Sequence, residues 1–443
     1  MAPRAEQSAS DLRLSDLQET WRLLTPEERQ EAFGELTRDE AEDFFFDLSA
    51  RDQHELLAGM PAADRRSWLR LLPPDDAADL IQEASDEERE NLLGLLDDAT
   101  LKEVRALLAY AEDDAGGLMN PRYLRVRPDV SVDEAFGYVR KQAREAISHV
   151  SYVYVIDADQ KLLGVLSLRE LFAATPDKTV RDLMTTELVT AGENLDQEAL
   201  SRLFAQTDLS AIPVVDSHGH MKGVVTVDDI VDVLQEEATE DIQKIGGTEA
   251  LDAPYLQVGL PQMVKKRVGW LAGLFVSEML TTTAMSRFEA EIERAVVLAV
   301  FIPLIISSGG NSGSQASTLV IRALALGELK LVDWWRVVRR ELASGVAMGA
   351  ILGAIGFTRV EIWQAIFHSY GPHHLLVAST IAASVIGVVT WGTLSGSMLP
   401  FALRRVGLDP ASASAPFVAT LVDVTGIVIY FTVASMILRG TLL

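Results

Sequence analysis

The positions of apolar residues divide the chain into three regions, and the first of them has a period of 12. Across residues 25–108 each unit begins with a residue that suits a helix start. An acid follows three positions later in six of the seven copies, and an apolar residue stands seven positions after the start. Ser or Thr followed by an acid at this spacing is the capping box of a helix N-terminus. Short helices repeated at a fixed period predict a small α-solenoid. The unit starts are Thr25, Thr37, Ser49, Pro61, Pro73, Ser85 and Asp97.

A second, weaker repeat occupies residues 118–240. Each copy has an apolar run, a tight polar turn, another apolar run and then a Ser or Thr that suits a helix N-cap. The runs lie at 153–157 and 164–170 in the first copy and at 212–216 and 223–229 in the second, so the final elements are 59 residues apart. The pattern predicts two copies of an α/β unit in which two strands lead into a helix.

The third region, after residue 265, is long and apolar enough to cross a membrane several times, since one crossing needs about 20 helical residues. We expect five spans, near 268–286, 295–321, 342–358, 375–399 and 411–438. The third is short as an uninterrupted apolar run and extends back through Trp334 and Trp335 if it is to cross fully. With the N-terminus inside, the cytoplasmic connections hold ten Lys and Arg and the outer segments four, which favours this orientation and an external C-terminus.

Charge separates the two halves of the chain. Positions 1–260 hold 54 acidic and 25 basic residues, a net charge of −29, whereas the remainder is close to neutral at +4. So acidic a region repels phosphate backbones, which argues against a nucleic-acid partner, and it attracts cations. The chain has no Cys, which excludes disulfides, thiolate metal sites and cysteine nucleophiles. The first 30 residues are polar and acidic, unlike a signal peptide.

Acids gather in the second α/β copy and in the helix expected after it. Those from residue 229 onward recur at spacings of three or four, which stacks carboxylates on one helix face, where like charges repel. A divalent cation prefers oxygen ligands of this kind, but a solvated acidic face is an equally good interpretation. The acids are Asp196, Glu198, Asp208, Asp228, Asp229, Asp232, Glu236, Glu237, Glu240 and Asp241.

Two of the expected spans carry polar groups, which are costly in a membrane and usually functional. In the second, residues 307–318 are small or amide-bearing and include Asn311, Ser314 and Gln315. Such a surface suits either a wet path or close helix packing. In the fifth span Asp423 is a single mid-membrane carboxylate, and Ala419 one turn before it leaves room for a hydrated ion. A proton relay is the alternative, although no second acid or His is expected beside Asp423. In a dimer two copies of Asp423 could share one divalent cation.

The repeat at 118–240 resembles a tandem pair of CBS domains. In that family an Asp three residues after the Ser or Thr of the last strand–helix junction holds the ribose of a nucleotide. The second copy has Asp229 at this position, whereas the first has Glu170. Tyr152 and Arg169 are candidates for stacking on adenine and meeting phosphate. ATP is therefore a possible ligand of this region.

The whole chain resembles the MgtE family of magnesium channels. The resemblance rests on residues 303–325, with Gly-Gly-Asn-Ser-Gly-Ser-Gln-Ala-Ser and Ile-Arg-Ala-Leu-Ala, and on residues 416–426. It implies a multidomain fold: an acidic α-helical solenoid (1–117), an α/β tandem CBS pair (118–241), a connecting helix (242–267) and an all-α, five-span pore domain (268–443). Glu278, inside the first span, departs from the small or apolar residue expected there.

The resemblance also implies function. It predicts a non-enzymatic homodimer in a bacterial inner membrane, surrounded by lipid, with the second and fifth spans lining the pore and Asp423 binding hydrated Mg²⁺. Cytosolic Mg²⁺ would bridge the solenoid and CBS surfaces and hold the pore shut. Ligands on the solenoid side are not fixed by the resemblance, and Asp75 and Asp76 are candidates only. The implied CBS and membrane-side metal ligands are Asp196, Glu198, Asp208, Asp229, Asp232, Glu237, Glu240, Asp241 and Asp409.

Three other functions stay open at this point. The protein could be a less selective transporter of Co²⁺, Ni²⁺ or Mn²⁺. It could be a proton-coupled carrier that uses Asp423, although a relay partner is missing. It could also be a nucleotide-responsive regulator that is only anchored in the membrane, against which the polar second span and Asp423 argue.

Overall fold

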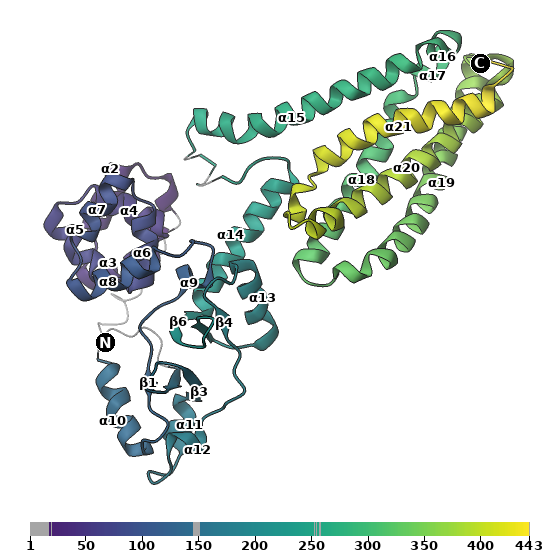
Figure 1. Ribbon diagram of the computed structural model, residues 1–443. Helices are drawn as coiled ribbons and strands as arrows, with labels where there is room; N and C mark the ends of the chain where they lie inside the picture. The colour runs from purple at the N-terminus through teal and green to yellow at the C-terminus, as the bar shows by residue number, and fades with distance from the viewer. Residues whose placement is uncertain are drawn as a thin grey trace, which may run out of the picture. The chain divides into compact units, whose positions relative to one another are not determined.

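The computed structural model describes residues 17–18, 20–144, 151–251, 253, 255–256 and 258–442. Its contacts divide the chain into two compact units, Met1–Leu234 and Gln235–Leu443, which are described separately below (Figure 1). The first unit holds short helices and two small sheets, and the second holds long helices.

The predicted 12-residue period is confirmed, because seven consecutive helices begin 12 residues apart. Thr25 and Thr37 form complete capping boxes with Glu28 and Glu40. The Ser49 and Asp97 side chains also accept hydrogen bonds from backbone N–H groups of their helices' first turns, which otherwise lack partners. After a short 3₁₀ helix, η1 (Trp21–Leu23), the helices are α2 (Pro26–Gly34), α3 (Arg38–Phe46), α4 (Ala50–Ala58), α5 (Ala62–Leu69), α6 (Pro74–Gln82), α7 (Asp86–Leu93) and α8 (Asp98–Leu107).

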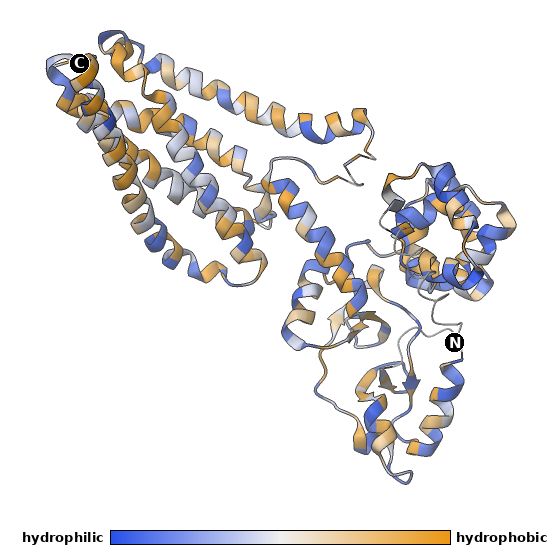
Figure 2. Ribbon diagram, turned by 180° about the vertical axis from the view of Figure 1, so that it is seen from behind, coloured by the Kyte–Doolittle hydropathy of each residue, from blue (hydrophilic) through white to orange (hydrophobic). Residues whose placement is uncertain are grey.

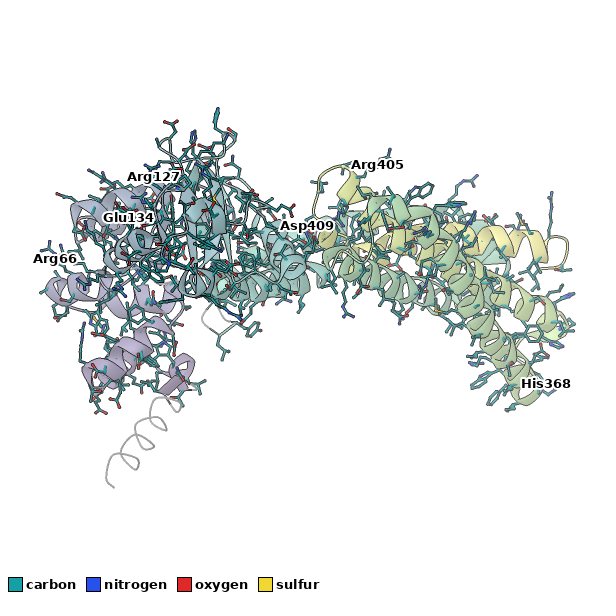
Figure 3. The ribbon with its side chains drawn as sticks, turned by 90° about the horizontal axis from the view of Figure 1, so that it is seen from below. Arg66, Arg127, Glu134, His368, Arg405 and Asp409 are labelled. Atoms are coloured by element: carbon teal, nitrogen blue, oxygen red, sulfur yellow. The ribbon has the colours of Figure 1, made fainter. Side chains whose placement is uncertain are left out.

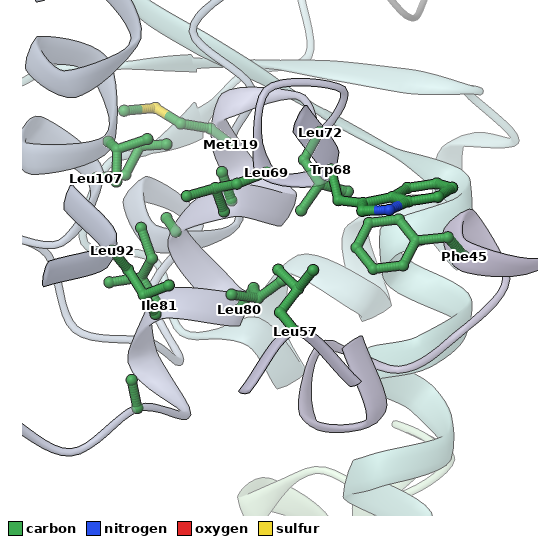
Figure 4. Close-up of a cluster of buried hydrophobic side chains, with 14 of the residues drawn as sticks. Phe45, Leu57, Trp68, Leu69, Leu72, Leu80, Ile81, Leu92, Leu107 and Met119 are labelled. Carbon is green, nitrogen blue, oxygen red and sulfur yellow. The ribbon is translucent and has the colours of Figure 1, made fainter. Parts of the chain in front are cut away.

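Alternate helices of the solenoid pack on one another, α2 on α4, α4 on α6 and α6 on α8 (Figure 1). Aromatic and aliphatic side chains fill the space between them, including fully buried Phe45, Leu69 and Leu80 (Figure 4). The same hydrophobic core continues into the second α/β copy through Met119 and Ile212. The solenoid and the second copy therefore share one core in this unit.

The α/β pair follows. Each copy has a three-stranded sheet in which a short first strand runs parallel to the second, and the second runs antiparallel to the third. Tyr152 pairs with Ser167 in the first copy, and Ala211 pairs with Thr226 in the second, an offset of 59 residues as predicted. The elements are α9 (Ala115–Leu118), β1 (Arg125–Val126), α10 (Val132–Gln142), β2 (Tyr152–Ile156), β3 (Leu162–Ser167), α11 (Leu168–Ala173), α12 (Val180–Leu183), β4 (Ala191–Gly192), α13 (Gln197–Thr207), β5 (Ala211–Val215), β6 (Met221–Thr226) and α14 (Val227–Ile245).

Five stretches of the second unit are long and apolar enough to span a membrane, as the sequence predicts. The third reaches back to Leu331, so it does extend through Trp334 and Trp335. Apolar residues dominate these helices, and α18 is the palest of them (Figure 2). The elements are α15 (Leu260–Arg287), α16 (Glu289–Arg294), α17 (Val296–Ala299), α18 (Ile302–Ala325), η2 (Leu331–Asp333), α19 (Trp334–Phe367), η3 (Gly371–His373), α20 (His374–Arg405), η4 (Pro410–Ser412) and α21 (Ala415–Leu438).

The prediction of one connecting helix at 242–267 is wrong. α14 runs from the second α/β copy only to Ile245, where Gly246 and Gly247 follow and Gly247 adopts a φ of +75°. Two successive glycines weaken a helix, and this left-handed conformation ends it. Residues from Leu260 onward, Lys265 and Lys266 among them, belong to the first spanning helix instead.

Candidate ion pathway and metal sites

α18 has one face that packs and one face that does not. Gly309, Gly313 and Ser317 are among its buried residues; the two glycines lie against α20 and α21, and the Ser317 hydroxyl donates to the backbone oxygen of Ala413, just before α21. A Cβ on Gly392 or Gly396 of α20 would lie 2.3 or 2.1 Å from the carbonyl oxygen of Gly309 or Gly313. The close packing expected as one interpretation of residues 307–318 is therefore present on this face.

The other face of α18 carries the remaining polar side chains. Ser307, Asn311, Gln315 and Thr318 are all exposed and recur at spacings of four, four and three, which places them along one stripe of the helix. We call these four residues the polar stripe. Ser314 lies beside the stripe, half-buried, and its hydroxyl donates to the backbone oxygen of Ala415 at 3.0 Å. In a single chain the polar stripe has no protein cover, which hydrocarbon would penalise.

Asp423 lies half-buried on α21, one turn after Ala419. Ala419 is where α21 meets α18, since a Cβ on Gly310 would lie 3.5 Å from it. Among the residues that the structure describes, no side chain forms a hydrogen bond or ion pair with the Asp423 carboxylate. The expectation that no second acid accompanies Asp423 is wrong, because Glu278 of α15 is near enough to act on it electrostatically. Glu278 lies well inside α15 and does not mark the end of that span.

A separate group of acids lies where the solenoid meets the second α/β copy. Asp75 and Asp76, in the first turn of α6, lie near the acids that begin α14. Burial, followed by repulsion from Asp229, Asp228 and Asp232, raises the pKa of Asp76 to about 6. Burial and the neighbouring Asp76 raise the pKa of Asp75, whose Oδ1 accepts a hydrogen bond from Asn120 Nδ2 at 3.0 Å. We call Asp75, Asp76, Asp228, Asp229 and Asp232 the acid cluster.

Three other predicted ligands do not join the acid cluster by any contact that the described residues show. Asp196 caps α13 by accepting from the backbone N–H groups of Glu198 and Ala199. Glu198 forms an ion pair with Arg202 at 2.5 Å. Asp208 ends α13 in a left-handed conformation, with a φ of 52°. Capping and ion pairing explain these three acids locally.

The predicted ligands Glu240 and Asp409 lie close together in the structure, where both form ion pairs with the same lysine. Lys244 Nζ lies 2.8 Å from Asp409 Oδ2 and also forms an ion pair with Glu240. Burial would lower the pKa of Lys244, but both carboxylates outweigh it and raise the pKa, so the ammonium stays charged. Asp409 lies near Arg405 at one end of the long helices, with His368 at the other (Figure 3). Glu237 and Asp241 lie on the same helix as Glu240.

The end of α14 and Gly247 just after it contact the two helices that carry the polar groups. Ile245 packs against Ile321 of α18 and Ala411 of η4. A Cβ on Gly247 would lie 2.8 Å from Trp270 Nε1 of α15 and 3.1 Å from Pro416 of α21. The Trp270 Nε1–H donates to Ser414 Oγ, at the N-cap of α21, at 3.2 Å. The segment after α14 thus touches the start of the helix on which Asp423 lies.

The α/β pair contains a pocket between its two sheets. Tyr152 and Tyr154 line it, and the buried Tyr154 hydroxyl has no hydrogen-bond partner among the described residues. Thr226, at the junction of β6 and α14, also lines it and donates its hydroxyl to Asp229 Oδ2 at 2.7 Å. Arg169, the other predicted nucleotide ligand, lies exposed on α11. Glu170 caps that helix through Ser167. The pocket is lined by Asn120, Arg122, Tyr123, Ser151, Tyr152, Tyr154, Ser210, Ala211, Val224 and Thr226.

Comparison with known proteins assigns all three regions. The family model of the MgtE divalent cation transporter matches residues 302–433, that of the MgtE intracellular N domain matches 12–113, and that of the CBS domain matches 115–177 and 180–236. The magnesium transporter MgtE of Thermus thermophilus is 41% identical over 369 residues, covering 83% of this chain and 80% of that protein. The chain belongs to the MgtE family.

Other MgtE proteins are similar over most of their length. The magnesium transporter MgtE of Enterococcus faecalis is 33% identical over 337 residues, 76% of this chain and 72% of its own. Among solved structures, the cytosolic domain of the Mg²⁺ channel MgtE in complex with ATP is 36% identical and covers 52% of this chain and 97% of that chain, with a TM-score of 0.47. The inosine-5′-monophosphate dehydrogenase of Aquifex aeolicus is 31% identical over 134 residues, about the length of the CBS pair.

These likenesses confirm the MgtE resemblance and the expected fold: helical N domain, CBS pair and helical membrane region. The chain is a multi-pass membrane protein whose named full-length relatives are transporters, not enzymes. Sequence reasoning placed Asp228 in a group of acids but did not single it out as a ligand, and it left Glu278 without a partner. Asp228 lies near Asp76 of α6, and Glu278 lies near Asp423 of α21. Both helices are far from these acids in the sequence, so no local pattern could indicate the proximity.

Proposed function

We propose that this MgtE protein conducts Mg²⁺ down its gradient across a bacterial inner membrane, with its N-terminus in the cytosol. The observation that carries the proposal is the half-buried, unpaired carboxylate of Asp423 on α21, which packs at Ala419 against the same helix that bears the polar stripe. Mg²⁺ gives up its waters reluctantly and is usually held by one or two carboxylates through retained water. One carboxylate beside a small residue suits such an ion.

We infer that the protein works as a homodimer. A polar stripe on α18 that faces hydrocarbon costs free energy, whereas a second copy would cover it and turn it into a hydrated wall. The same arrangement would place two copies of Asp423 around one path. The stripe and Ser314 then supply oxygen and amide groups to the water around the ion.

Uptake of Mg²⁺ into proteoliposomes, followed with an internal dye, tests this proposal. Asp423→Ala should abolish uptake in a protein that stays dimeric on a sizing column, while Glu328→Gln, at an exposed acid between α18 and α19, should leave uptake intact as a matched control. Wild-type uptake in Asp423→Ala would refute the pathway. Competition by Co²⁺, Ni²⁺ or Mn²⁺ measures selectivity, and the effect of an imposed pH gradient tests the proton-coupled alternative, for which Glu278 supplies a second acid.

We further propose that cytosolic Mg²⁺ holds the pathway shut by binding at the acid cluster. Five carboxylates gathered at the contact between the solenoid and the second CBS domain repel one another, and a divalent cation would remove that repulsion. A ligand shifts a conformational equilibrium by its difference in affinity for the two states, so Mg²⁺ favours the form in which these acids are together. α14 begins at the cluster and its end contacts α18 and η4.

Flux measured against the Mg²⁺ concentration on the cytosolic side tests this gating. Combined Asp75→Asn, Asp76→Asn and Asp228→Asn changes should leave flux high at millimolar Mg²⁺, where the intact protein closes. Asp196→Asn, which alters only a helix cap, is the matched control and should close like the wild type. Closure of the triple variant at the unchanged Mg²⁺ concentration would place the sensor elsewhere.

A second candidate function is nucleotide binding by the CBS pair. The pocket there presents aromatic side chains for a base, and the buried Tyr154 hydroxyl has no partner among the described residues. Calorimetry of the full-length protein with ATP tests this. Tyr152→Ala should weaken binding strongly, and Arg169→Ala should weaken it only if the phosphates extend toward α11. Absence of heat at millimolar ATP would remove ATP from the account.

A further inference from the structure

Three side chains capable of binding metal gather on the tight turn between β5 and β6, and none of them belongs to the ion pathway or to the acid cluster. Asp216, His218 and His220 each place one ligand atom within 4.8 Å of those of the other two, the one such group among the residues that the structure describes. The two imidazole rings stack with their centroids 5.9 Å apart and their planes at 29°. His218 is exposed and the other two are partly exposed, so the group is open to solvent.

The backbone fixes where these side chains lie. Asp216 Oδ1 accepts from the N–H groups of His218 and His220, both at 2.9 Å, and Gly219 closes the turn with a φ of +84°. Two backbone hydrogen bonds also tie the turn to the matching turn of the first CBS domain. Leu162 N–H donates to the Gly219 oxygen and Met221 N–H donates to the Gln160 oxygen, each at 3.0 Å. The three side chains are thus held on a rigid support.

The matching turn shows that this fold does not need histidine. There Asp157 Oδ1 accepts from the N–H groups of Asp159 and Lys161 in the same way, both at 2.9 Å. Asp159 and Lys161 stand where the second turn has His218 and His220, at the 59-residue offset of the repeat. The two imidazoles are therefore additional to what folds the turn.

We propose that this turn binds a first-row transition-metal ion of the Zn²⁺ type, through His218, His220 and Asp216. Imidazole nitrogen with one carboxylate is a common donor set for Zn²⁺, whereas Mg²⁺ prefers oxygen alone. Three protein ligands leave a fourth position for water. Ligand atoms of a tetrahedral Zn²⁺ site lie about 3.3 Å apart, which follows from bonds of about 2.0–2.1 Å. Small side-chain rotations would bring the present distances to that value.

Two existing contacts of Asp216 change when the ion binds. His220 Nδ1 lies 2.9 Å from Asp216 Oδ2, and if this nitrogen binds the metal its proton moves to Nε2, which gives the other neutral tautomer. Lys222 Nζ lies 3.2 Å from the same Oδ2 and competes with the metal for it. Removing the lysine charge should therefore strengthen binding.

Calorimetric titration of ZnCl₂ into the full-length protein in detergent, with millimolar Mg²⁺ present to occupy the oxygen sites, tests the proposal. We expect one Zn²⁺ site per chain that His218→Ala combined with His220→Ala weakens at least tenfold. His373→Ala combined with His374→Ala removes two neighbouring imidazoles elsewhere and should leave this site unchanged. Equal Zn²⁺ binding by the wild type and the His218/His220 variant would overturn the proposal.

Two further measurements specify the ligands. Co²⁺ bound in place of Zn²⁺ should give visible absorption bands that the His218/His220 variant lacks, while unchanged bands would overturn the assignment. Lys222→Met should tighten Zn²⁺ binding several-fold if Asp216 is a ligand. Unchanged affinity in Lys222→Met would remove Asp216 from the site. Far-UV circular dichroism of every variant checks that the turn substitutions leave the fold intact.

Discussion

Replacing Asp76 by Asn should stabilise the contact between the solenoid and the second CBS domain when Mg²⁺ is absent. The carboxylate of Asp76 is largely buried beside Asp229, Asp228 and Asp232, and its pKa is about 6 instead of the ordinary 3.8. This difference corresponds to about 3 kcal/mol by which ionised Asp76 destabilises the docked arrangement at neutral pH if Asp76 returns fully to water when the contact opens. Asn has nearly the same shape and carries no charge, so it removes most of this cost.

The sign of the pH effect follows from the same difference. Because the pKa is higher in the docked form, that form binds a proton more readily. Its stability therefore falls as the pH rises from about 4 to about 6, stays low above that, and is restored as the pH falls back toward 4. The raised pKa of Asp75 acts in the same direction. Without Mg²⁺ the wild type should hold this contact more firmly at pH 5 than at pH 7.5, and Asp76→Asn should show less of this dependence.

Hydrogen–deuterium exchange of peptides from α6, measured on the full-length protein in EDTA at pH 7.5, gives the opening free energy of this contact. A gain of about 3 kcal/mol would slow exchange by about a hundredfold. Asp64→Asn is the matched control, because Asp64 has the same place in its own repeat but is exposed. The exchange rate of Asp64→Asn gives the small loss of stability that follows when a negative charge is removed from the N-terminus of a helix. If Asp76→Asn exchanges no more slowly than Asp64→Asn, the acids do not destabilise the contact and are no Mg²⁺ sensor.

Three other substitutions test the membrane half. Asp423→Asn, which keeps the side chain's shape, should reduce Mg²⁺ flux at least tenfold without lowering the melting temperature of the protein in detergent, and a flux equal to wild type would contradict the pathway. Gly396→Ala should destabilise the membrane helices by roughly 1–3 kcal/mol, because the new Cβ meets the Gly313 carbonyl oxygen at 2.1 Å, whereas Gly273→Ala, with nothing within 4 Å, should cost nothing. Lys244→Met leaves the carboxylates of Glu240 and Asp409 without the cation that they share. Disulfide cross-linking between cysteines introduced at Ile245 and Ala411 should then be slower in EDTA and be restored by Mg²⁺. An unchanged cross-linking rate in EDTA would argue that Lys244 does not hold the end of α14 against η4.

Local patterns in this sequence are sufficient to predict its local structure. The seven helix starts from Thr25 to Asp97 could be read directly, because the signals of a helix start are local: the side chains of Thr25 and Asp97, for example, bond to backbone N–H groups within three positions. The five spans could be predicted for a similar reason, since length and hydropathy decide them. The break in the expected connecting helix could also have been predicted, because Gly246 and Gly247 disfavour a helix, whereas the packing of Gly247 against Trp270 and Pro416 exists only in the fold.

The sites show the same division between local and distant information. Asp423 was evident because a carboxylate within an apolar span is unusual by itself. Two pairs of acids come close to each other although they are more than 140 residues apart in the sequence. They are Asp423 with Glu278, and Asp76 with Asp228. No spacing rule connects such positions, so the sequence could suggest each acid but not which acids meet. It also could not show that Asp196 caps α13 and that Glu198 forms an ion pair with Arg202.

The constant 12-residue unit of the solenoid constrains how its length can evolve. Each of the helices α2–α8 begins 12 residues after the one before, and alternate helices pack together. Duplication or loss of a whole unit would keep every later apolar residue facing the core, but between α6 and Asn120 it would displace Asp75 and Asp76 relative to the CBS surface. An insertion of one or two residues would instead rotate the buried faces of the helices beyond it. Homologous solenoids that keep the acid cluster should therefore vary in length on the N-terminal side of α6, in multiples of 12, and stay constant between α6 and Asn120.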